Sequence, residues 1–344
     1  MDIVLNLAMM LELNRLVEEG YISRRKHPSQ DLYILNYTPK TQYEGVWNSI
    51  TSACRGLIVD GKGEIKARCF PKFFNYEECG DKVHERLGTG LGFSISEKMD
   101  GSLGILYWVG GRPFIATRGS FESDQAVRAN IMLSKYDTSS LDMNLTYLFE
   151  IIYPENRICV DYKGREDLVF LSAYETASGR EVSPAHPFPS ASRHDIGSDF
   201  GAIKALNLDN QEGFVVRFDD GYRFKIKFED YVRLHRIIFS VSTRSIWNAL
   251  RHGDKLDLND LPDEIYGWIK EVKKELTDAY CAMEMDAIRI FNGIKTSSRK
   301  EFASRALDYG CSGILFKMLD GRPHEDLIWK AIEPEYRTPR HEEV

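Results

Sequence analysis

One lysine stands at a predicted turn between two strands. The segment 97–104 reads EKMDGSLG, and Lys98 lies between an apolar alternation at 93–95 and an apolar run at 103–107. Because Asp-Gly is a frequent turn dipeptide, Lys98 is expected on a short connection that holds its side chain in place. A plain solvated hairpin turn has the same pattern, so the rest of the chain must distinguish the two interpretations.

Two carboxylates and several cations stand at predicted strand positions. Glu150 interrupts the apolar stretch 147–153, where an unpaired buried carboxylate is costly, so it faces either solvent or a cation in a cleft. The period of two in 222–228 puts Lys225 and Lys227 on one face, as in an edge strand protected by lysines or in an anion site. Taken singly, each cation also fits a structural role. The further candidates are Arg55, Lys72, Arg118 and Glu212.

Together these residues suit a nucleoside triphosphate bound with a divalent metal. A lysine amine attacks phosphorus only after it has lost its proton, and its reference pKa is about 10.4. Lys225, Lys227 and a divalent ion would favour the neutral form of Lys98. The same cations would neutralise the phosphoryl oxygens during in-line displacement. One cluster is therefore expected to activate the nucleophile and to stabilise the transition state.

The elements that must position these residues are mainly strands up to about residue 240. A basic cluster at 24–27 is expected in a solvated loop, with contact to a phosphate backbone as the alternative. The segment 183–198 is expected to be a surface loop. Helical spacing is found at 4–19 and 122–135, and strand patterns cover 32–37, 53–61, 114–120, 147–153, 168–174, 212–218 and 222–228.

From about residue 241 helical patterns replace strand patterns. The longest predicted helix is amphipathic and covers 263–293. Shorter helices are expected at 243–251, 298–308, 312–319 and 323–332. The sequence thus predicts an α+β domain over 1–240 and an all-helical domain over 241–344.

Composition narrows the class of protein further. The 45 Lys and Arg against 52 Asp and Glu give a net charge of −7, which argues against nucleic-acid binding over the whole surface but leaves a local basic groove open. No apolar stretch reaches the roughly 18 residues of a membrane span, and the N-terminus lacks the basic region of a signal peptide. The six cysteines form no Cys-x-x-Cys pair, so neither a zinc site nor a disulfide framework is indicated. We expect a globular protein of the cytoplasm.

The motifs taken in order resemble those of the bacteriophage T4 RNA ligase 1 family. Lys98-Met99-Asp100-Gly101 is similar to the nucleotidyl-acceptor motif of the covalent nucleotidyltransferase superfamily, which contains ATP-dependent ligases and capping enzymes. The other matching segments cover most of residues 37–236 and include Cys54-Arg55-Gly56, Lys72-Phe73-Phe74-Asn75, Gly119-Ser120, Phe149-Glu150, Asn156-Arg157-Ile158, Glu212-Gly213, Phe224-Lys225-Ile226-Lys227 and Tyr231-Val232. The resemblance implies an adenylation domain of mainly antiparallel sheets with flanking helices.

The same resemblance implies a reaction and a set of roles. Lys98 would take AMP from ATP as a phosphoramidate, the AMP would pass to an RNA 5′-phosphate, and a 3′-hydroxyl would displace it to seal the strand. Glu212 would hold the catalytic Mg²⁺ or Mn²⁺. The implied ATP-binding residues are Arg55, Lys72 and Arg118 at the phosphates, Phe74 as their support, Glu97 beside the nucleophile, Glu150 at the ribose, Val215 and a side chain of the strand 168–171, with Phe170 as the candidate, around the adenine, and Lys225 with Lys227 at the α-phosphate. The phage pattern has lysine where Arg118 stands, so the charge is kept but the geometry is not.

The helical region after residue 240 matches the family only in being helical. In that family it is a separate substrate-recognition module, so the resemblance implies that 241–344 selects the RNA, for example a broken tRNA. A kinase or phosphatase that prepares the RNA ends is an implied partner.

Two other classes remain open at the level of sequence. A DNA ligase or a GTP-dependent capping enzyme shares the lysine chemistry, but both usually carry an OB-fold where this chain is helical. A non-catalytic RNA-binding module would keep basic and aromatic residues without needing Lys98, Glu150 and Glu212 together.

Overall fold

The computed structural model describes residues 7–254, 263–294, 296 and 298–339. Contacts within the chain separate a first unit that runs to Val232 from a second unit that begins at Arg233. Helix α7 (Glu229–Ser240) contains this boundary.

Three sheets build the described part of the first unit, and all their strand pairs but one are antiparallel. The β3 sheet has the order β1 (Ile22–Lys26), β2 (Leu32–Tyr37), β3 (Arg55–Asp60), β4 (Ile65–Ala67). The β9 sheet has the order β11 (Glu181–Val182), β10 (Asp167–Glu175), β9 (Leu145–Ile152), β7 (Ser102–Val109), β8 (Arg112–Thr117). The β13 sheet has the order β12 (Arg193–His194), β6 (Phe93–Glu97), β13 (Gly213–Phe218), β14 (Arg223–Lys227), β5 (Phe74–Asn75), with β14 and β5 parallel.

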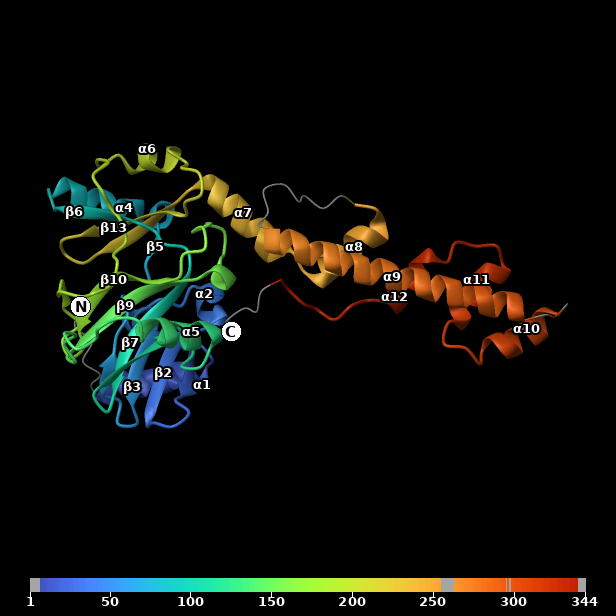
Figure 1. Cartoon of the computed structure of the whole chain (residues 1–344), viewed down its shortest axis with the longest axis horizontal. Coiled ribbons are helices and arrows are strands. Elements are labelled where there is room, and N and C mark those ends of the chain that lie inside the picture. The colour runs from blue at the N-terminus through green and yellow to red at the C-terminus, as the bar shows by residue number, and fades with distance from the viewer. Residues whose placement is uncertain (1–6, 255–262, 295, 297, 340–344) are drawn as a thin grey trace. The chain divides into compact units, whose positions relative to one another are not determined.

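Helices cover the outer faces of these sheets, as Figure 1 shows. The β3 sheet packs one face on α1 (Leu7–Glu18) and α3 (Ser49–Ala53) and its other face on the β9 sheet. Helix α5 (Asp124–Leu133) covers the second face of the β9 sheet. The β13 sheet buries Phe214, Phe218 and Phe224 on the side of α4 (Tyr76–Gly88) and α6 (Phe200–Ala205), where Phe200 contacts Phe224. The first unit also contains α2 (Pro39–Glu44) and a 3₁₀ turn at Pro154–Asn156.

The strand period of two explains which residues each sheet turns toward its neighbours. Phe224, Ile226 and Phe228 are completely buried, whereas Lys225 and Lys227, which alternate with them, are only half-buried. This face assignment confirms the prediction made from the sequence. The edge-strand interpretation is wrong, because β14 is hydrogen-bonded to β13 on one side and to β5 on the other.

Two further expectations are corrected. The basic cluster at 24–27 is not a loop: Arg24 to Lys26 belong to β1, whose backbone pairs with β2 while its cations stay exposed. The segment 183–198 contains the short strand β12, which pairs with β6. Charged side chains are compatible with such edge strands because only the backbone is needed for pairing.

All the regular secondary structure described in the second unit is helical. Its helices are α8 (Thr243–His252), α9 (Asp263–Gly293), α10 (Arg299–Ala306), α11 (Ser312–Leu319) and α12 (Glu325–Ala331), close to the predicted ranges. Ser242 caps α8 by accepting a hydrogen bond from the Ser245 amide. Ala287 of α9 packs with Phe302, Ile314, Leu315 and Ile328, so the long helix forms the core of this unit.

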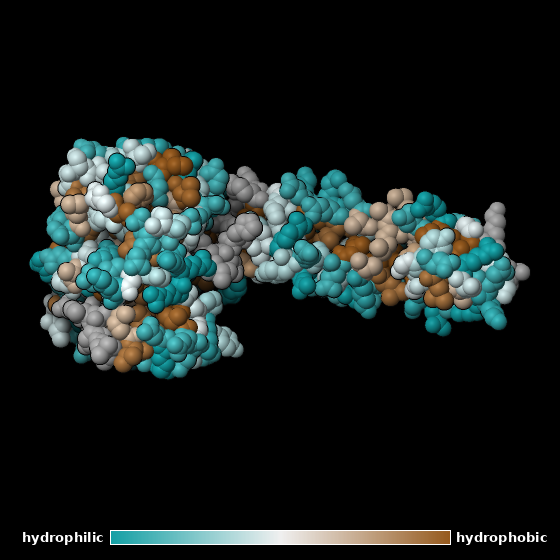
Figure 2. Space-filling model, turned by 90° about the horizontal axis from the view of Figure 1, so that it is seen from below, coloured by the Kyte–Doolittle hydropathy of each residue, from teal (hydrophilic) through white to brown (hydrophobic). Residues whose placement is uncertain are grey.

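The surface is mostly hydrophilic in the view of Figure 2, with apolar side chains in small groups. In the part of the chain that the structure describes, every helix is too short or too polar to pass through a bilayer.

Candidate active site

The Lys98 turn connects two sheets and is not the tip of a hairpin. It leaves β6 of the β13 sheet and enters β7 of the β9 sheet. The Lys98 amide donates to the Gly213 carbonyl (2.9 Å), and the Gly101 amide donates to Oε1 of Glu150 (3.0 Å). The turn, here defined as residues 98–101 and called the nucleophile turn, is therefore fixed to both sheets.

Glu212 holds two lysines at once. Its Oε2 lies 2.9 Å from Nζ of Lys98, and its Oε1 lies 2.7 Å from Nζ of Lys227. The Glu212 side chain is only 3% exposed, whereas Lys98 and Lys227 are 20% and 24% exposed. Gly213 permits this arrangement, because a side chain there would meet the Ile226 carbonyl oxygen at 1.9 Å. The amine of Lys98 is thus held in the site and does not point into bulk water.

The charges around Lys98 favour its protonated form. Burial acts to lower the pKa of Lys98, but the Glu212 and Glu150 carboxylates outweigh it and raise that pKa. The expected neutral form of Lys98 depends also on a divalent ion beside the two lysines, so it stays a prediction. Burial instead lowers the pKa of Lys225 to about 7, and the Lys98 and Lys227 ammoniums act in the same direction.

Glu150 lies on the same side of the β9 sheet as the nucleophile turn. Burial raises its pKa to about 7; Lys98 opposes this change, and Glu212 and Asp100 add to it. Of the two environments that the sequence left open for Glu150, the structure shows the one beside a cation, with the Glu150 side chain half-buried.

Asp100 anchors the nucleophile turn, a role that the sequence prediction missed. Its Oδ2 accepts hydrogen bonds from the Cys159 and Val160 amides (2.7 and 2.8 Å), and its Oδ1 accepts one from the Tyr231 hydroxyl (2.7 Å). The Asp100 amide donates to the Tyr162 hydroxyl at 2.8 Å. In the sequence Asp-Gly indicates only a turn, and the partners lie about 60 and 130 residues further along the chain, where no local pattern points to Asp100.

Three of the predicted phosphate-binding cations surround Tyr37. Burial acts against ionisation of the Tyr37 hydroxyl, but Arg118, Arg55 and Lys72 together lower its pKa. Nη1 of Arg118 donates to the Tyr37 oxygen (3.3 Å). Nη1 of Arg55 donates to Sγ of Cys69, also at 3.3 Å. These cations come from three separate segments, and the fold brings them together as predicted.

Aromatic rings position Lys72. Its Nζ lies 5.4 Å from the ring centre of Tyr37, 5.3 Å from that of Trp47 and 5.6 Å from that of Phe74. Phe74 therefore supports a cation of the cluster, and Trp47 is a second support that sequence reasoning did not identify. Glu97 is half-buried at the end of β6, where its amide donates to the Ser192 carbonyl.

The structure places Val215 at the site but not Phe170. Val215 stands directly opposite Lys225, on the half-buried face of the β13 sheet. On β10, Val169 pairs with Glu150 and Phe170 pairs with Phe149, so Phe170 points to the opposite face of the sheet from Glu150. Its ring packs on His186, with ring centres 3.9 Å apart. On the side of the nucleophile turn, β10 presents the buried Val169 and the half-buried Leu171, and both belong to one apolar cluster with Met99.

The site has more positive charge than its own carboxylates balance. In the described ranges, Arg55, Lys72, Arg118 and Lys225 have no carboxylate within ion-pair distance, while Lys98 and Lys227 share Glu212. Confining like charges in a partly buried site is unfavourable unless an anion joins them. The arrangement therefore fits a polyanionic ligand such as a triphosphate.

The carboxylates fit a divalent ion shared with phosphates better than a metal site built by protein alone. Within residues 7–254, 263–294, 296 and 298–339, no three His, Cys, Asp or Glu side chains gather closely enough to hold an ion. Mg²⁺ commonly uses one or two carboxylates, substrate phosphates and water. Glu150 and Glu212 can provide the carboxylates, although both oxygens of Glu212 already accept from lysines. The metal role of Glu212 stays a prediction.

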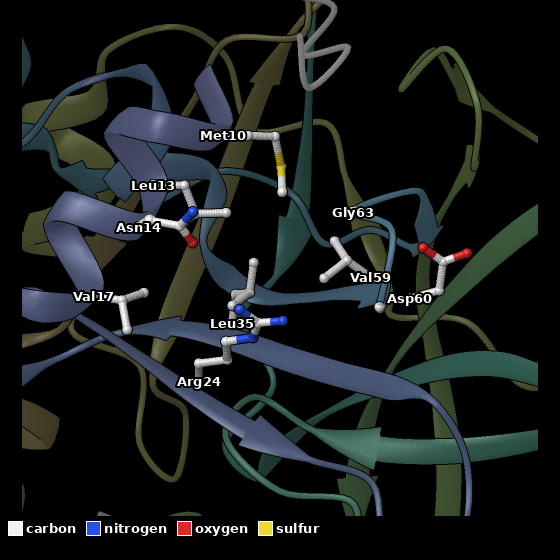
Figure 3. A pocket seen from close by; sticks show the side chains of 10 residues that line it. Met10, Leu13, Asn14, Val17, Arg24, Leu35, Val59, Asp60 and Gly63 are labelled. Carbon is white, nitrogen blue, oxygen red and sulfur yellow. The ribbon is translucent and has the colours of Figure 1, made fainter. Parts of the chain in front are cut away.

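The hollow in Figure 3 is a separate feature of the first unit. Its lining comes from α1, from β1 to β3 and from the turn after β3, and it includes Met10, Val17 and Asp60. Its volume of about 20 Å³ is roughly that needed for one water molecule. No predicted site residue lines it, so it is not the candidate active site.

Comparison with known proteins identifies relatives of this chain. A Thermovibrio ammonificans protein named as a candidate RNA ligase is 27% identical over 290 residues, which are 74% of this chain and 73% of that protein. An Autographa californica nuclear polyhedrosis virus protein named as a candidate bifunctional polynucleotide kinase/RNA ligase is 24% identical over 66% of this chain, which spans 38% of the viral protein.

Among solved structures, a Naegleria gruberi RNA ligase variant with ATP and Mn resembles the chain with a TM-score of 0.40 and 17% identity, over 48% of this chain and 56% of that one. The RNA ligase family typified by T4 RNA ligase 1 matches residues 53–232, more than half of the chain and the stretch that contains every predicted site residue. The chain belongs to this family of RNA ligases.

Proposed function

We propose that the protein is an ATP-dependent RNA ligase that joins 5′-phosphate and 3′-hydroxyl ends through a lysyl-AMP intermediate on Lys98. The observation that carries this proposal is the position of the Lys98 amine. It lies against Glu212 and beside cations that have no carboxylate of their own within the residues described. Family membership supports the class of reaction.

The first step is attack of Lys98 on the α-phosphorus of ATP. The Nζ lone pair forms a P–N bond, the P–O bond to the β-phosphate breaks, and pyrophosphate leaves. Lys98 must first lose a proton, which its carboxylate neighbours retain on the amine. A divalent ion bound at Glu150 or Glu212 would offset these carboxylates and the phosphate charge. Lys225 and Lys227 would stabilise the negative charge that develops on the phosphoryl oxygens.

The second and third steps use RNA ends. An oxygen of the RNA 5′-phosphate attacks the AMP phosphorus, the P–N bond breaks, and Lys98 leaves as the amine and regains a proton. A 3′-hydroxyl then attacks the RNA 5′-phosphorus, loses its proton and releases AMP. Only the first two steps need the amine of Lys98, whereas all three need a site that holds adenylate.

We assign this activity to RNA repair in the cytoplasm. The helical unit is proposed to select the RNA, for example a broken tRNA. A separate kinase or phosphatase is proposed to prepare the ends, and the viral relative whose name joins a kinase to a ligase supports such a link.

The test is incubation of the purified protein with Mg²⁺ and either ATP or GTP, without nucleic acid, followed by intact-mass measurement. Gain of one AMP from ATP alone supports the ligase, and gain of GMP supports a capping enzyme. Absence of any adduct supports a non-catalytic RNA-binding module. Lys98→Ala should form no adduct but should still seal RNA that already carries a 5′-adenylate, slowly. Sealing of ordinary 5′-phosphate RNA by Lys98→Ala at the unaltered rate would refute the proposal.

A further inference from the structure

An ionic cluster at a distance from the nucleophile turn joins the two sheets that enclose the candidate site. Glu181, on β11 of the β9 sheet, accepts a hydrogen bond from Nε of Arg217 on β13 (2.5 Å) and another from Arg223 on β14. The Ser172 hydroxyl of β10 donates to the same carboxylate. We call Glu181, Arg217 and Arg223 the sheet clasp.

The clasp is shielded from water. The Arg223 side chain is 10% exposed, Glu181 17% and Arg217 31%. Burial acts to raise the pKa of Glu181, but the Arg223 and Arg217 guanidiniums outweigh it and hold that pKa below its ordinary value. Loss of the carboxylate would leave two guanidiniums unpaired in a partly buried place, which is far more costly than loss of a surface ion pair.

The clasp lies on the same face of the β13 sheet as the site. Arg217 is paired with Arg223, and two residues away along the strands Val215 is paired with Lys225. Because side chains two apart in a strand share a face, Arg223, Lys225 and Lys227 form one row. Arg223 also shares an aromatic ring with a site residue: it lies 5.6 Å from the ring centre of Phe70, and Arg55 lies 4.9 Å from the same centre.

The two sheets are thus tied to each other at both ends of β13. At its beginning, Gly213 accepts from the Lys98 amide, and the nucleophile turn reaches Glu150 of the β9 sheet. Toward its end, Arg217 reaches Glu181 of the β9 sheet. The groups proposed to act on ATP are divided between these sheets: Glu150 stands on one, and Lys225 and Lys227 stand on the other.

We propose that the sheet clasp fixes the separation of the two sheets along β13, and that Glu181 is thereby a positioning residue for transfer of AMP to Lys98. The inference rests on the proposed function. Transfer requires the amine, the α-phosphate and the phosphate-binding cations to be aligned, and a displacement of about 1 Å costs on the order of 100-fold in rate. Among the residues described, the Glu181 carboxylate bonds to Ser172, Arg217 and Arg223 and not to Lys98, so its proposed effect on the site is transmitted through the two arginines.

The test measures lysyl-AMP formation in a single turnover, with the Kd for ATP and the thermal unfolding midpoint measured on the same samples. Glu181→Gln should lower the rate at saturating ATP by about 10- to 100-fold. The Kd for ATP should stay equal or fall, because two guanidiniums beside the phosphate cluster are no longer neutralised. Damage to the fold alone would instead raise Kd and lower the midpoint together. Glu181→Asp, which keeps the carboxylate, should recover most of the rate.

Two further variants make the result decisive. Glu175→Gln is the matched control, because Glu175 pairs with Arg180 on the same β10–β11 hairpin without reaching the β13 sheet, and its rate should be unaltered. Arg217→Gln removes one contact of the clasp, at the most exposed of its three residues. This variant should therefore fold even if Glu181→Gln does not. Its rate of lysyl-AMP formation should also fall, but by less than that of Glu181→Gln. Rates within twofold of the unaltered protein for both clasp variants, or rates that fall only with the folded fraction, would overturn the clasp. Absence of an adduct in the unaltered protein would overturn the proposed function itself.

Discussion

The affinity for ATP should fall as the pH rises above 7, because Lys225 needs its proton to pair with a phosphate. Burial, with the Lys98 and Lys227 ammoniums acting in the same direction, lowers the pKa of Lys225 to about 7. A bound polyphosphate would raise that pKa toward the reference value of about 10.4. At a pH between the pKa of free Lys225 and the pKa of bound Lys225, the complex holds one proton more than the free protein. The affinity for ATP therefore falls as the pH rises.

The size of the effect follows from proton linkage. With a pKa of about 7, Lys225 carries its proton in about a quarter of the molecules at pH 7.5 and in about 3% at pH 8.5. If the bound form stays protonated, the Kd for ATP should rise about eightfold over this interval. Below pH 6 the Kd should be nearly independent of this group, because Lys225 is then already charged.

Isothermal titration calorimetry with a non-hydrolysable ATP analogue measures this effect. Buffers with different ionisation enthalpies report the protons taken up at pH 8, and we expect close to one. Lys225→Arg is the control, because a guanidinium stays charged and should make the Kd flat across the interval. Glu150 has a pKa of about 7 as well, but it is unchanged in this variant, so the difference belongs to Lys225. A flat Kd or a release of protons in the unaltered protein would refute the reasoning.

Three further predictions follow from the site and its supports. Glu212→Gln leaves two lysines without their shared carboxylate. The AMP adduct should therefore be lost, and the free energy of unfolding, measured by urea denaturation, should fall by about 3 kcal/mol. An adduct that forms as in the unaltered protein would contradict this role of Glu212. Gly213 has φ 141° and no room for a side chain beside Ile226, so Gly213→Ala should lower both the thermal midpoint and adduct formation, and a native midpoint would contradict the geometry. Phe170→Ala should lower the stability of the protein without raising the KM for ATP, whereas Leu171→Ala should raise that KM. If steady-state assays show the opposite pattern, Phe170 and not Leu171 contacts the adenine.

The sequence predicted those parts of the structure that depend on local patterns. The alternation in 222–228 placed Lys225 and Lys227 on the face opposite Phe224, and the structure has them there. The helical spacing in 263–293 corresponds to α9. The lysine turn also lies between two strands as expected. Strand and helix periods are properties of the segment itself, so these predictions did not need knowledge of tertiary contacts.

The parts that failed depend on neighbours distant in the chain. The pairing of β10 with β9 decides which side chains of β10 face the site. This pairing places Phe170 on the face opposite the site. The sequence also did not show that Glu150 and Glu212 raise the pKa of Lys98, because these residues come together only where the Lys98 turn joins two sheets. The hydrogen bond from Tyr231 to Asp100 and the clasp at Glu181 likewise join residues that no sequence pattern connects.

Locating the AMP on the protein tests directly whether Lys98 is the nucleophile. The protein is incubated with Mg²⁺ and ATP, digested under conditions that preserve phosphoramidates, and the modified peptide is sequenced by mass spectrometry. We expect a single AMP on Lys98, labile in acid and absent from Lys98→Ala. An AMP on any other side chain, or a protein that stays unmodified with Mg²⁺ and ATP present, would contradict it.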